Sequence, residues 1–585
     1  MMAGGKNSPE IRLSGIGVSE GIRIGKALLY GRQAALPLND IAASEVEQEV
    51  AKLTAARERC LQEVSQLYQQ ARQLVGDQQA GVIQAQESFL NDPGFCPAME
   101  KLIRTKLFSA AKAADQVING TAAIFENMPN EYMRERAADI KDIGCRLLAV
   151  LAGGKATCLS ELREKVILIA ADLAPSDTLQ LNKQYIQAFV TQKGGKTSHT
   201  AIFSKTIGIP AVIGVGDAIA AIADGDTVIV DGTAGLCIVQ PSPDTLRSYQ
   251  AAISRENEGN SVLQNFAGQP AVTVDGYRVE IGANIGTKAD AQYALEQGAE
   301  GVGLLRTELI YMAADRWPDE EEQLAIYRDI IQAMDNKPVI IRTLDIGGDK
   351  ALPYLQIPPE ANPFLGYRAI RLCLDRQALF GVQLRAILRA SAFGAVQIMF
   401  PMISCLDEWR QARSLVEEMK DQLRAEGQSF AEDIQVGMMI EVPSAAILAR
   451  QFAQEVDFFS IGTNDLVQYT LAVDRMNEKV DYLYDHFHPA ILALIGQVVQ
   501  AAHAEGKSVG MCGGMAGDPQ AAPLLLALGL DELSMSATAI RKVKFAISRL
   551  ELESCRNLLA DVLQLSTAGE IRMKVEQYLT RKDIR

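Results

Sequence analysis

The residues best suited to chemistry stand in one short stretch, Lys193 to Val212, which reads KGGKTSHTAIFSKTIGIPAV. His199 lies in this stretch at the predicted start of a short apolar helix, and small or hydroxylated residues precede it at Gly194, Gly195, Thr197 and Ser198. Glycines let the backbone approach a ligand closely, and the first N–H groups of a helix suit a phosphate. The stretch therefore predicts an imidazole that carries or receives an anion.

This stretch has two other interpretations. GGKTS resembles the end of a nucleotide-binding P-loop, but that motif needs a glycine at the position of Val190, so a P-loop is rejected. His199 could also be a purely structural helix cap, with Gly208 and Pro210 ending the helix. The chain has only 4 histidines, and the place of this one favours the functional interpretation.

A second set of reactive residues lies in the C-terminal half. Four arginines have planar, permanently charged guanidinium groups that suit a phosphate and a carboxylate on one small substrate. They are Arg306, Arg342, Arg368 and Arg475. Glu441 and Asp465 form a possible two-carboxylate site for Mg²⁺, which uses few protein ligands, and Asn464 adds an amide. Each of these residues alone would more commonly be a surface or salt-bridge residue. Their common placement is what favours a site.

Cys512 lies in VGMCGGMAGDP, between a predicted strand and a glycine turn. A buried thiol is the ordinary structural role for cysteine. At the end of a strand it could instead act as an acid, a base or a nucleophile, and the sequence does not choose among these three roles.

The elements that must position this second set are predicted from eight short apolar runs separated by mostly helical stretches. The runs are Val279 to Asn284, Val302 to Leu305, Val339 to Ile341, Ala395 to Phe400, Val436 to Ile440, Phe458 to Ile461, Ser508 to Met511 and Glu532 to Met535. Eight such units in roughly 300 residues predict a (β/α)8 barrel. The candidate residues stand at or beyond the ends of these runs, where a barrel builds its active site.

The N-terminal half changes character three times. Ile11 to Tyr30 predicts one or two strands that pair with a distant segment, and Ser44 to Val75 predicts a long helix that begins with a capping box of Ser44 and Glu47. Helical pattern continues to about Leu151, and apolar strands from Lys165 onward then predict an α/β unit that holds His199. The polar helical segment that follows suits a linker between moving domains.

Composition limits the class of protein. At 585 residues, with 48% hydrophobic and 22% charged residues, the chain predicts several globular units. A net charge of −15 argues against a general binder of nucleic acid or anionic membrane. The 9 scattered cysteines show no paired motif, and neither a signal core nor a membrane-length apolar stretch is present. We therefore expect a cytoplasmic enzyme with reduced thiols.

Several long motifs identify a family. GGKTSHTAIFSKTIGIPAV, GLLRTELIYM, RTLDIGGDK, NPFLGYRAIR, GMMIEVPSA, SIGTNDLVQYTLAVDR and GMCGGMAGD closely resemble Enzyme I of the bacterial phosphotransferase system, of the sugar-system type, in the family order from about Ser14 to nearly the C-terminus. The resemblance implies that His199 takes the phosphoryl group from phosphoenolpyruvate and passes it to a histidine of the carrier protein HPr, releasing pyruvate. This is the first step of sugar uptake by that system.

The resemblance also implies roles for individual residues. Phosphate and carboxylate would be bound by Arg306, Arg342, Arg368 and Arg475 with Asn464, and Mg²⁺ by Glu441 and Asp465. Cys512 would protonate the enolate of pyruvate, and Thr178 in APSDTLQL matches a threonine near the phosphohistidine. An inactive scaffold that binds HPr-like partners is the alternative function. Against that alternative, every motif residue expected for the chemistry is present.

The implied architecture is multidomain α/β. It has a swivelling phosphohistidine domain (11–43 and 152–243), an all-helical HPr-binding insert (44–151), a helical linker (244–270) and a TIM-type barrel that binds phosphoenolpyruvate and forms a homodimer (271–585). The insert departs from the family pattern at Gln86, where the family has a histidine, so the HPr contacts stay open. Pyruvate phosphate dikinase and phosphoenolpyruvate synthase share the motifs but carry a large ATP-grasp domain, for which this chain has no room.

Overall fold

The fold is described from a computed structural model. It describes the following residues: 10–19, 21–30, 38–75, 89–92, 94–126, 140–141, 143–148, 150–151, 162–173, 185–195, 200–201, 204, 208–348, 350, 352, 354–355, 357–477, 479–582 and 584. The chain divides into two compact units, residues 1–258 and 259–585, and each is described by itself.

The first unit contains an eight-stranded sheet with the order β1-β8-β7-β3-β4-β5-β6-β2. Its strands are β1 Ile11–Ser14, β2 Ile16–Ser19, β3 Ile22–Tyr30, β4 Val166–Ala170, β5 Ile186–Thr191, β6 Ala211–Ile213, β7 Thr227–Asp231 and β8 Leu236–Val239. Strands β3 to β6 run parallel, whereas β1, β2 and β7 make antiparallel pairs. The expected pairing of the N-terminal segment with distant strands is confirmed, although it forms three strands.

The central strands of this sheet are buried because their sequences are continuous apolar runs. Most of VILIA in β4 and of IQAFVT in β5 is buried, as expected for parallel strands covered on both faces. Separate apolar clusters lie on the two faces, one containing Ile167 and Val190 and the other Leu168 and Phe189. This alternation packs both faces of the central strands.

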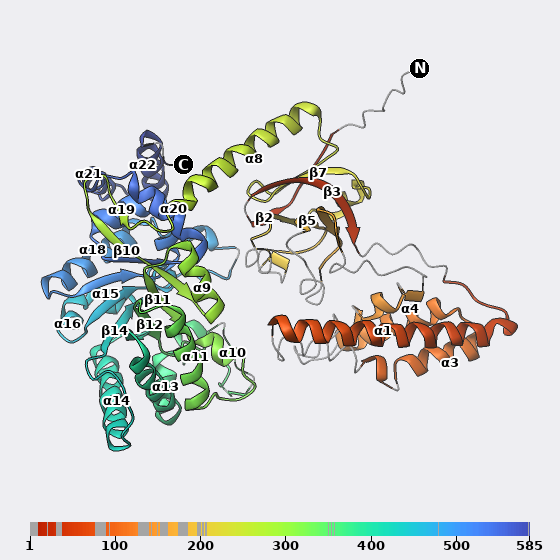
Figure 1. The fold of residues 1–585 in the computed structure, drawn as a ribbon, viewed down its shortest axis with the longest axis horizontal. Helices are drawn as coiled ribbons and strands as arrows, with labels where there is room; N and C mark the ends of the chain where they lie inside the picture. Colours follow the sequence, from red (N-terminus) through yellow and green to blue (C-terminus); the bar gives the residue numbers. More distant parts are fainter. Residues whose placement is uncertain are drawn as a thin grey trace. The chain divides into compact units, whose positions relative to one another are not determined.

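Helices of the first unit form a bundle with its own core. They are α1 Val46–Val75, α3 Cys96–Lys106 and α4 Ala110–Glu126 (Figure 1). Leu53, Cys60 and Val64 of α1 pack in this core at helical spacing. The expected capping box is wrong: a 3-10 turn, Ala43–Glu45, precedes α1, and Glu45 accepts the Ala42 N–H at 2.8 Å. Glu47 instead pairs with Arg104 of α3.

The polar segment after β8 forms one long helix, α8 Pro243–Gln264, which begins in the first unit and ends in the second. The helical character predicted for this segment is confirmed. The division of the chain into four domains with the boundaries given above stays a prediction.

The second unit is built on a closed parallel barrel (Figure 1). Its strands are β10 Arg278–Ile285, β11 Gly301–Arg306, β12 Val339–Arg342, β13 Val396–Phe400, β14 Gln435–Ile440, β15 Phe458–Ile461, β16 Ser508–Met511 and β17 Glu532–Met535. Each strand pairs in parallel with the next, and β17 and β11 both pair with β10, which closes the ring. The short strand β9 Ala271–Val272 adds to β10 in the antiparallel direction. The predicted (β/α)8 barrel is confirmed.

The helices that follow the strands are α9 Lys288–Gln297, α10 Glu308–Met312, α11 Glu320–Ala333, α12 Ile370–Asp375, α13 Gln377–Ala390, α14 Leu406–Ala425, α15 Pro443–Ile447, α16 Ala449–Ala453, α17 Thr463–Leu471, α18 Pro489–Ala504, α19 Ala522–Leu528, α20 Ala537–Ser548, α21 Leu552–Val562 and α22 Ala568–Arg581. Local sequence fixes several ends: Asp319 caps α11 by accepting from Glu322 N, and Gly298 ends α9 with φ +95°.

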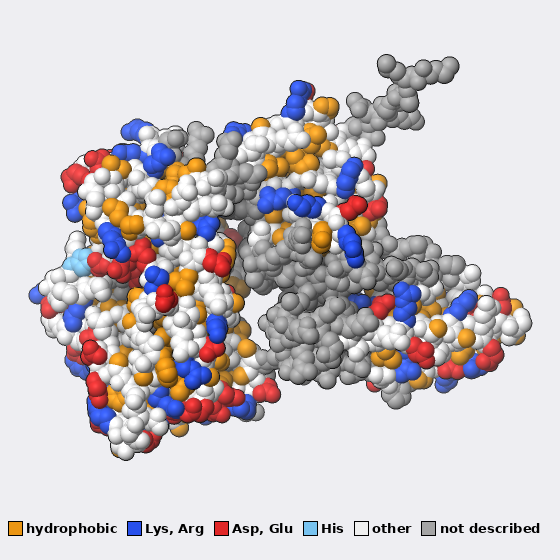
Figure 2. All heavy atoms as spheres, viewed as in Figure 1, with side chains coloured by type: hydrophobic (Ala, Val, Ile, Leu, Met, Phe, Trp, Pro, Cys, Tyr) orange, Lys and Arg blue, Asp and Glu red, His pale blue; other side chains and the backbone are white. Residues whose placement is uncertain are grey.

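The surface of the second unit is mixed in charge. Acidic and basic side chains are interspersed over the face of the barrel in Figure 2. Within the described ranges, every helix is too short or too polar to cross a bilayer.

Candidate active site

The predicted site residues of the barrel stand at one end of it. Arg306 and Arg342 are the last residues of β11 and β12, and Glu441 directly follows β14. Asn464 and Asp465 lie in the first turn of α17, after β15, and Cys512 follows β16. Because the strands are parallel, all these positions share the C-terminal rim, where barrel enzymes place their active sites.

Five charged side chains at this rim form a paired cluster, which we define as Glu308, Arg342, Asp345, Lys350 and Arg368. Arg342 binds Glu308 Oε1 at 2.6 Å and Asp345 Oδ2 at 3.2 Å. Lys350 Nζ binds the same two carboxylates at 3.0 and 3.1 Å, and Arg368 binds Asp345 Oδ1 at 2.9 Å. The two guanidinium groups are therefore held rigidly in place.

Electrostatics keep the carboxylates of the paired cluster ionised although they are buried. Burial by itself would raise the pKa of Asp345, but attraction to Arg342, Lys350 and Arg368 outweighs it and holds the pKa far below its ordinary value. The pKa of Glu308 is lowered against the effect of burial by Arg342 and Lys350. Within the described residues, Arg342 Nε, Arg368 Nε and Glu308 Oε2 lack a hydrogen-bond partner, so the cluster is not fully satisfied by the protein.

Glu441 is in a different situation. It is 1% exposed and accepts a 2.6 Å hydrogen bond from Met402 N. Burial and repulsion from Asp465 and Asp345 raise its pKa to about 8, and Arg342 and Arg368 offset only part of this. In the described part of the chain no lysine or arginine forms an ion pair with it. Glu441 is thus a buried carboxyl group that needs either a proton or an additional cation.

Asp465 links the cluster to the neighbouring loops. It contacts Arg368 Nη1 at 3.2 Å and Arg475 Nη1 at 3.6 Å. The guanidinium groups of Arg368 and Arg475 both lie 5.8 Å from the centre of the Phe364 ring, which orients them by cation–π contact. The structure therefore brings three of the four predicted arginines together. Arg306 lies exposed on the rim, without an ion-pair partner among the described residues.

Asn464 and Cys512 belong to adjoining loops. Asn464 Oδ1 accepts a 2.9 Å hydrogen bond from Gly514 N, two residues after Cys512. Cys512 itself is 4% exposed, with its Sγ 3.9 Å from the Ile461 carbonyl oxygen. Burial raises the pKa of its thiol to about 11, helped by the charges of Glu441 and Glu532. At neutral pH the thiol is protonated, which fits an acid among the three roles left open.

The donor set at this rim fits a divalent cation. Glu441 and Asp465 are two buried carboxylates with repulsion between them, and Glu441 lacks a cationic partner in the described residues. Those residues include no ready-made cluster of three His, Cys, Asp or Glu ligands. That is compatible with Mg²⁺, which uses one or two carboxylates and fills the rest of its shell with water and substrate oxygens.

Sequence reasoning missed four groups that hold the arginines in place. These are Glu308, Asp345, Lys350 and Tyr469, whose hydroxyl accepts from Arg368 Nη1 at 3.0 Å and donates to the Phe364 carbonyl oxygen at 2.5 Å. A signal was available for three of them. Glu308 follows Arg306 by two residues, and Asp345 and Lys350 lie in RTLDIGGDK after β12.

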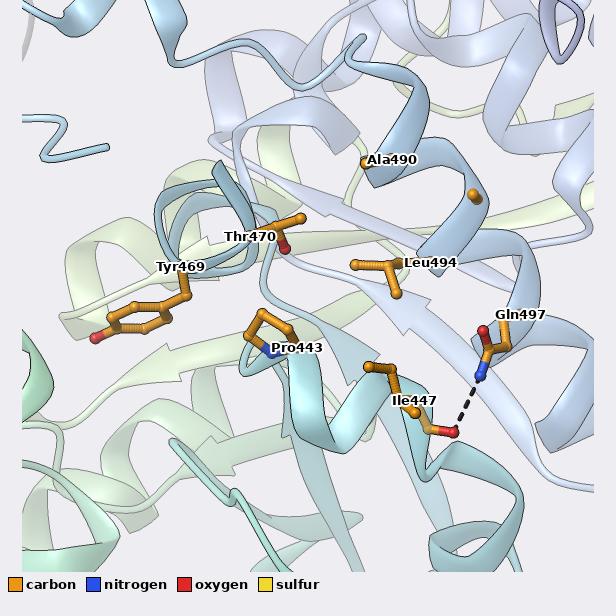
Figure 3. A pocket seen from close by; sticks show the side chains of 8 residues that line it. Pro443, Ile447, Tyr469, Thr470, Ala490, Leu494 and Gln497 are labelled. Carbon is orange, nitrogen blue, oxygen red and sulfur yellow. Dashed lines mark hydrogen bonds between the residues drawn. The ribbon is translucent and has the colours of Figure 1, made fainter. Parts of the chain in front are cut away.

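An apolar hollow of about 400 Å³ lies behind α17 (Figure 3). Pro443, Ile447, Ala490 and Leu494 line it, and Gln497 donates to the Ile447 carbonyl oxygen at 3.0 Å. Tyr469 also borders the hollow, but its hydroxyl points away from it (Figure 3). The hollow contains none of the predicted site residues and is distinct from the charged site.

The loop predicted to carry phosphate is described only in part. Gly194, three residues after the end of β5, has φ +122°, a conformation that favours glycine. A β-carbon on Gly195 would meet no described atom within 4 Å, so space is free beside this residue. The Ser204 carbonyl accepts from Gly208 N, and Gly208 has φ +67°, a geometry typical of a glycine that ends a helix. Thr178, Thr197, Ser198 and His199 lie outside the described residues.

Comparison with known proteins now identifies the family. Models for the PEP-utilising enzymes match three segments: the N-terminal domain at 14–136, the mobile domain at 162–235 and the PEP-binding domain at 260–552. The chain is 48% identical to the phosphoenolpyruvate-protein phosphotransferase of Geobacillus stearothermophilus over 567 residues, which cover 96% of this chain and 97% of that protein. The chain belongs to the phosphoenolpyruvate-protein phosphotransferase family.

Further members of this family give the same result. The phosphoenolpyruvate-protein phosphotransferase of Staphylococcus carnosus is 47% identical over 97% of this chain and 99% of its own length. That of Bacillus subtilis is 46% identical over 96% and 98%. Similarity over nearly the whole length of both chains supports an enzyme of this family and not an inactive scaffold. The charged rim described above lies within the segment that matches the PEP-binding domain.

Proposed function

We propose that this protein transfers the phosphoryl group of phosphoenolpyruvate to its own His199 and then to a histidine of the carrier protein HPr, releasing pyruvate. The observation that carries the proposal is the rim of the barrel, where buried arginines, two carboxylates and a protonated thiol meet at the strand ends. A phosphate, a carboxylate and a developing enolate are the three groups that such a set would recognise. The family name of the relatives supports the same reaction.

The arginines are proposed to bind the substrate. Arg342 and Arg368, fixed by Glu308 and Asp345, would hold a phosphate or carboxylate without first having to be ordered, which is the advantage of a preorganised site. Arg306 is exposed on the rim and Arg475 is half-buried, so both could close on the substrate. Asn464 would add one amide contact next to them.

Mg²⁺ is the proposed cofactor, with Glu441 and Asp465 as its protein ligands. When bound, the ion would supply positive charge that neutralises the phosphate and the developing enolate. The protein prepares the place by burying Glu441 beside Asp465 without a full complement of cations. Loss of the proton from Glu441 would accompany loading of the site, since a carboxyl group must be ionised to bind a metal.

Cys512 is the proposed proton donor. Cleavage of the phosphate ester leaves an enolate, and the Cys512 thiol would give its proton to the methylene carbon to form pyruvate. Its raised pKa keeps the proton on sulfur until an acceptor of sufficient basicity appears. A nucleophilic role is disfavoured, because the thiolate is the nucleophile and this thiol is not ionised at neutral pH.

His199 is proposed as the carrier of the phosphoryl group. Gly194 and Gly195 would allow the backbone to approach the phosphate, and Thr178, Thr197 and Ser198 would donate hydrogen bonds to it. Because the imidazole must meet both a substrate in the barrel and an outside partner, we propose that the domain carrying it swivels on the linker at 244–270. The helical insert at 44–151 would dock HPr.

The remaining parts of the proposal rest on the resemblance. We propose a cytoplasmic homodimer assembled through the barrel at 271–585, with the phosphohistidine domain at 11–43 and 152–243. HPr and phosphoenolpyruvate are the proposed partner and substrate of sugar uptake. Neither nucleic acid nor membrane insertion has a part in this function.

Labelling tests the proposal directly. Purified full-length protein is incubated with phosphoenolpyruvate labelled in its phosphate and Mg²⁺, and we expect an acid-labile, alkali-stable label on His199. The variant His199→Ala should take up no label, while His503→Ala, whose side chain is 43% exposed, should be labelled like the wild type. Addition of HPr from the same cell should then remove the label. Label that persists in His199→Ala would overturn the proposal.

A further inference from the structure

Below Cys512 the barrel interior contains an acid that the proposed reaction does not use. Glu532 is the first residue of β17, and its side chain enters the barrel. Glycines of three other strands surround its carboxyl group: a β-carbon on Gly282, Gly303 or Gly510 would lie 2.2, 2.2 or 2.9 Å from one of its oxygens. Any side chain at these positions would displace the acid. The interior is therefore shaped around this carboxyl group.

A structural role explains this arrangement poorly. Barrel interiors are normally filled by branched apolar side chains, and here one apolar cluster contains Leu304, Ile340, Met399, Met439 and Phe458 together with Cys512. Among the described residues Glu532 forms neither an ion pair nor a hydrogen bond. The titratable groups that interact with it electrostatically are Glu280, its register partner on β10, and Cys512, which follows β16. A carboxyl group without a partner destabilises a core, so a leucine would serve packing better.

The position of Glu532 relative to Cys512 follows from strand register. Gly510 lies opposite Glu532 and Met511 opposite Leu533, which places Cys512 opposite Ser534. Residues two apart on a strand face the same side and are separated by about 7 Å, so the acid lies one layer below the thiol. A β-carbon on Gly303 would lie 2.2 Å from Glu532 Oε1 and 2.6 Å from Ser534 Oγ, so these oxygens are at most 4.8 Å apart, the sum of the two distances.

Hydrogen bonds continue from this layer to the thiol loop. Ser534 Oγ donates to Asn284 Oδ1 at 2.8 Å, and Asn284 Nδ2 donates to the Cys512 carbonyl oxygen at 2.9 Å. Ser534 is 1% exposed, whereas Glu532 is only partly buried. Polar groups therefore extend from the partly exposed Glu532, past Ser534 and Asn284, to the backbone carbonyl of Cys512, whose thiol is buried.

We propose that Glu532 is the proton reservoir that reprotonates Cys512 after each turnover. This inference rests on the proposed function of Cys512. When the S–H bond breaks and the C–H bond of pyruvate forms, a thiolate remains under the product. The O–H bond of Glu532 then breaks and the S–H bond reforms, through one water or through the Ser534 hydroxyl once it has turned away from Asn284, and the resulting carboxylate takes a proton from solvent.

The acidity of the two groups favours this direction of transfer. Burial, with repulsion from Glu280, raises the pKa of Glu532 to about 7, and the pKa of Cys512 is about 11. Glu532 is therefore partly protonated at neutral pH and is a stronger acid than the thiol. A thiolate formed at Cys512 would be reprotonated downhill.

Exchange of the pyruvate methyl protons for solvent deuterium tests the proposed role of Glu532, because this exchange needs no phosphoryl transfer. Full-length protein with Mg²⁺ and pyruvate in D₂O is followed by proton NMR, because exchange requires that a proton taken up by Cys512 leave for solvent. Glu532→Gln should slow this exchange at least tenfold, while the first turnover, measured as label on His199 from phosphoenolpyruvate, stays within twofold of the wild type. Glu553→Gln, at an exposed carboxylate of α21 whose side chain is 72% exposed, is the matched control and should change neither rate.

The outcomes separate the two proposals. Wild-type exchange in Glu532→Gln, or equal slowing of exchange and labelling, would overturn the reservoir. Labelling of the wild-type protein without exchange of the pyruvate methyl protons would also overturn the role of Glu532. A wild-type protein that shows neither labelling nor exchange would overturn the proposed function itself. If Glu532→Gln fails to fold, Glu532→Asp retains an acid withdrawn by one carbon, and the same split between slowed exchange and unchanged labelling is expected.

Discussion

Two adjacent regions of the barrel rim differ in whether their buried ionisable groups have cationic partners. In the paired cluster, each carboxylate lies within 3.2 Å of at least two cationic groups and stays ionised. The neighbouring region consists of Glu441 and Cys512, and we call it the corner. Both side chains lack such partners in the described residues, and both have raised pKa values. The first region keeps its charges fixed for binding. The second keeps protons that can be released, which is what metal loading and proton transfer require.

The largest expected effect comes from removing the Cys512 thiol of the corner. Cys512→Ala should lower the rate of pyruvate formation by roughly 10²- to 10⁴-fold, the usual contribution of general acid catalysis. Binding of phosphoenolpyruvate should change little, because the paired cluster is untouched. Stopped-flow measurement of pyruvate release, together with calorimetric binding of the substrate, separates the two quantities. An unchanged rate would return Cys512 to a purely structural role.

The next effect tests the paired cluster through stability. Asp345→Asn removes the charge shared by Arg342, Lys350 and Arg368, and breaking a buried pair commonly lowers the free energy of unfolding by about 3–5 kcal/mol. Urea denaturation measures the loss. The control is Asp421→Asn, whose pair with Arg424 is exposed and should contribute at most about 1 kcal/mol. Equal losses in the two variants would show that the buried paired cluster is no more sensitive to loss of a charge than an exposed ion pair.

The pH dependence of stability tests the corner again. Because the pKa of Glu441 is raised in the folded protein from 4.5 to about 8, folding favours its protonated form. Its contribution is complete below about pH 4.5 and is lost as the pH rises through 8. Denaturation at pH 5 and pH 8 without metal should show this loss in the wild type and not in Glu441→Gln. Mg²⁺ should restore stability at pH 8 only when Glu441 is present.

The smallest effect concerns the contact between the substrate arginines and α17. Tyr469→Phe removes the hydroxyl that links Arg368 to the Phe364 carbonyl oxygen, and one hydrogen bond contributes about 0.5–1.5 kcal/mol. We expect a 2- to 10-fold rise in the KM for phosphoenolpyruvate with little change in kcat. Tyr482→Phe, at a residue that is 76% exposed, serves as the control and should leave KM unchanged.

Much of the fold was predictable because buried parallel strands have continuous apolar sequences. The predicted bounds Phe458 to Ile461, Ser508 to Met511 and Glu532 to Met535 are those of β15, β16 and β17. Helix ends were less predictable: Ser44 has the right residue type for a cap, but a preceding 3-10 turn moves the start of α1 to Val46. A cap depends on the path of the chain before the helix, which a local pattern does not contain.

The site was predictable only where its residues stand at strand ends. Arg342 and Glu441 could be placed at the rim from sequence, because their strands could be placed. The motif RTLDIGGDK marks Asp345 and Lys350 as candidates, but both lie in an irregular loop. Nothing in their spacing indicates that Asp345 pairs with Arg342 and Lys350 with Glu308. Ion pairs between loops depend on side-chain directions that periodicity does not encode.

By itself the sequence determined the order of the elements and the type of chemistry. Apolar periodicity defines strands and helices, and the motifs supply the histidine, the arginines, the carboxylates and the thiol. Only the tertiary structure decided which charges are compensated, because burial and distance, not residue type, set the pKa values of Asp345 and Glu441 in opposite directions. It also placed Glu532 among glycines of three other strands, below Cys512, a proximity that only closure of the barrel creates.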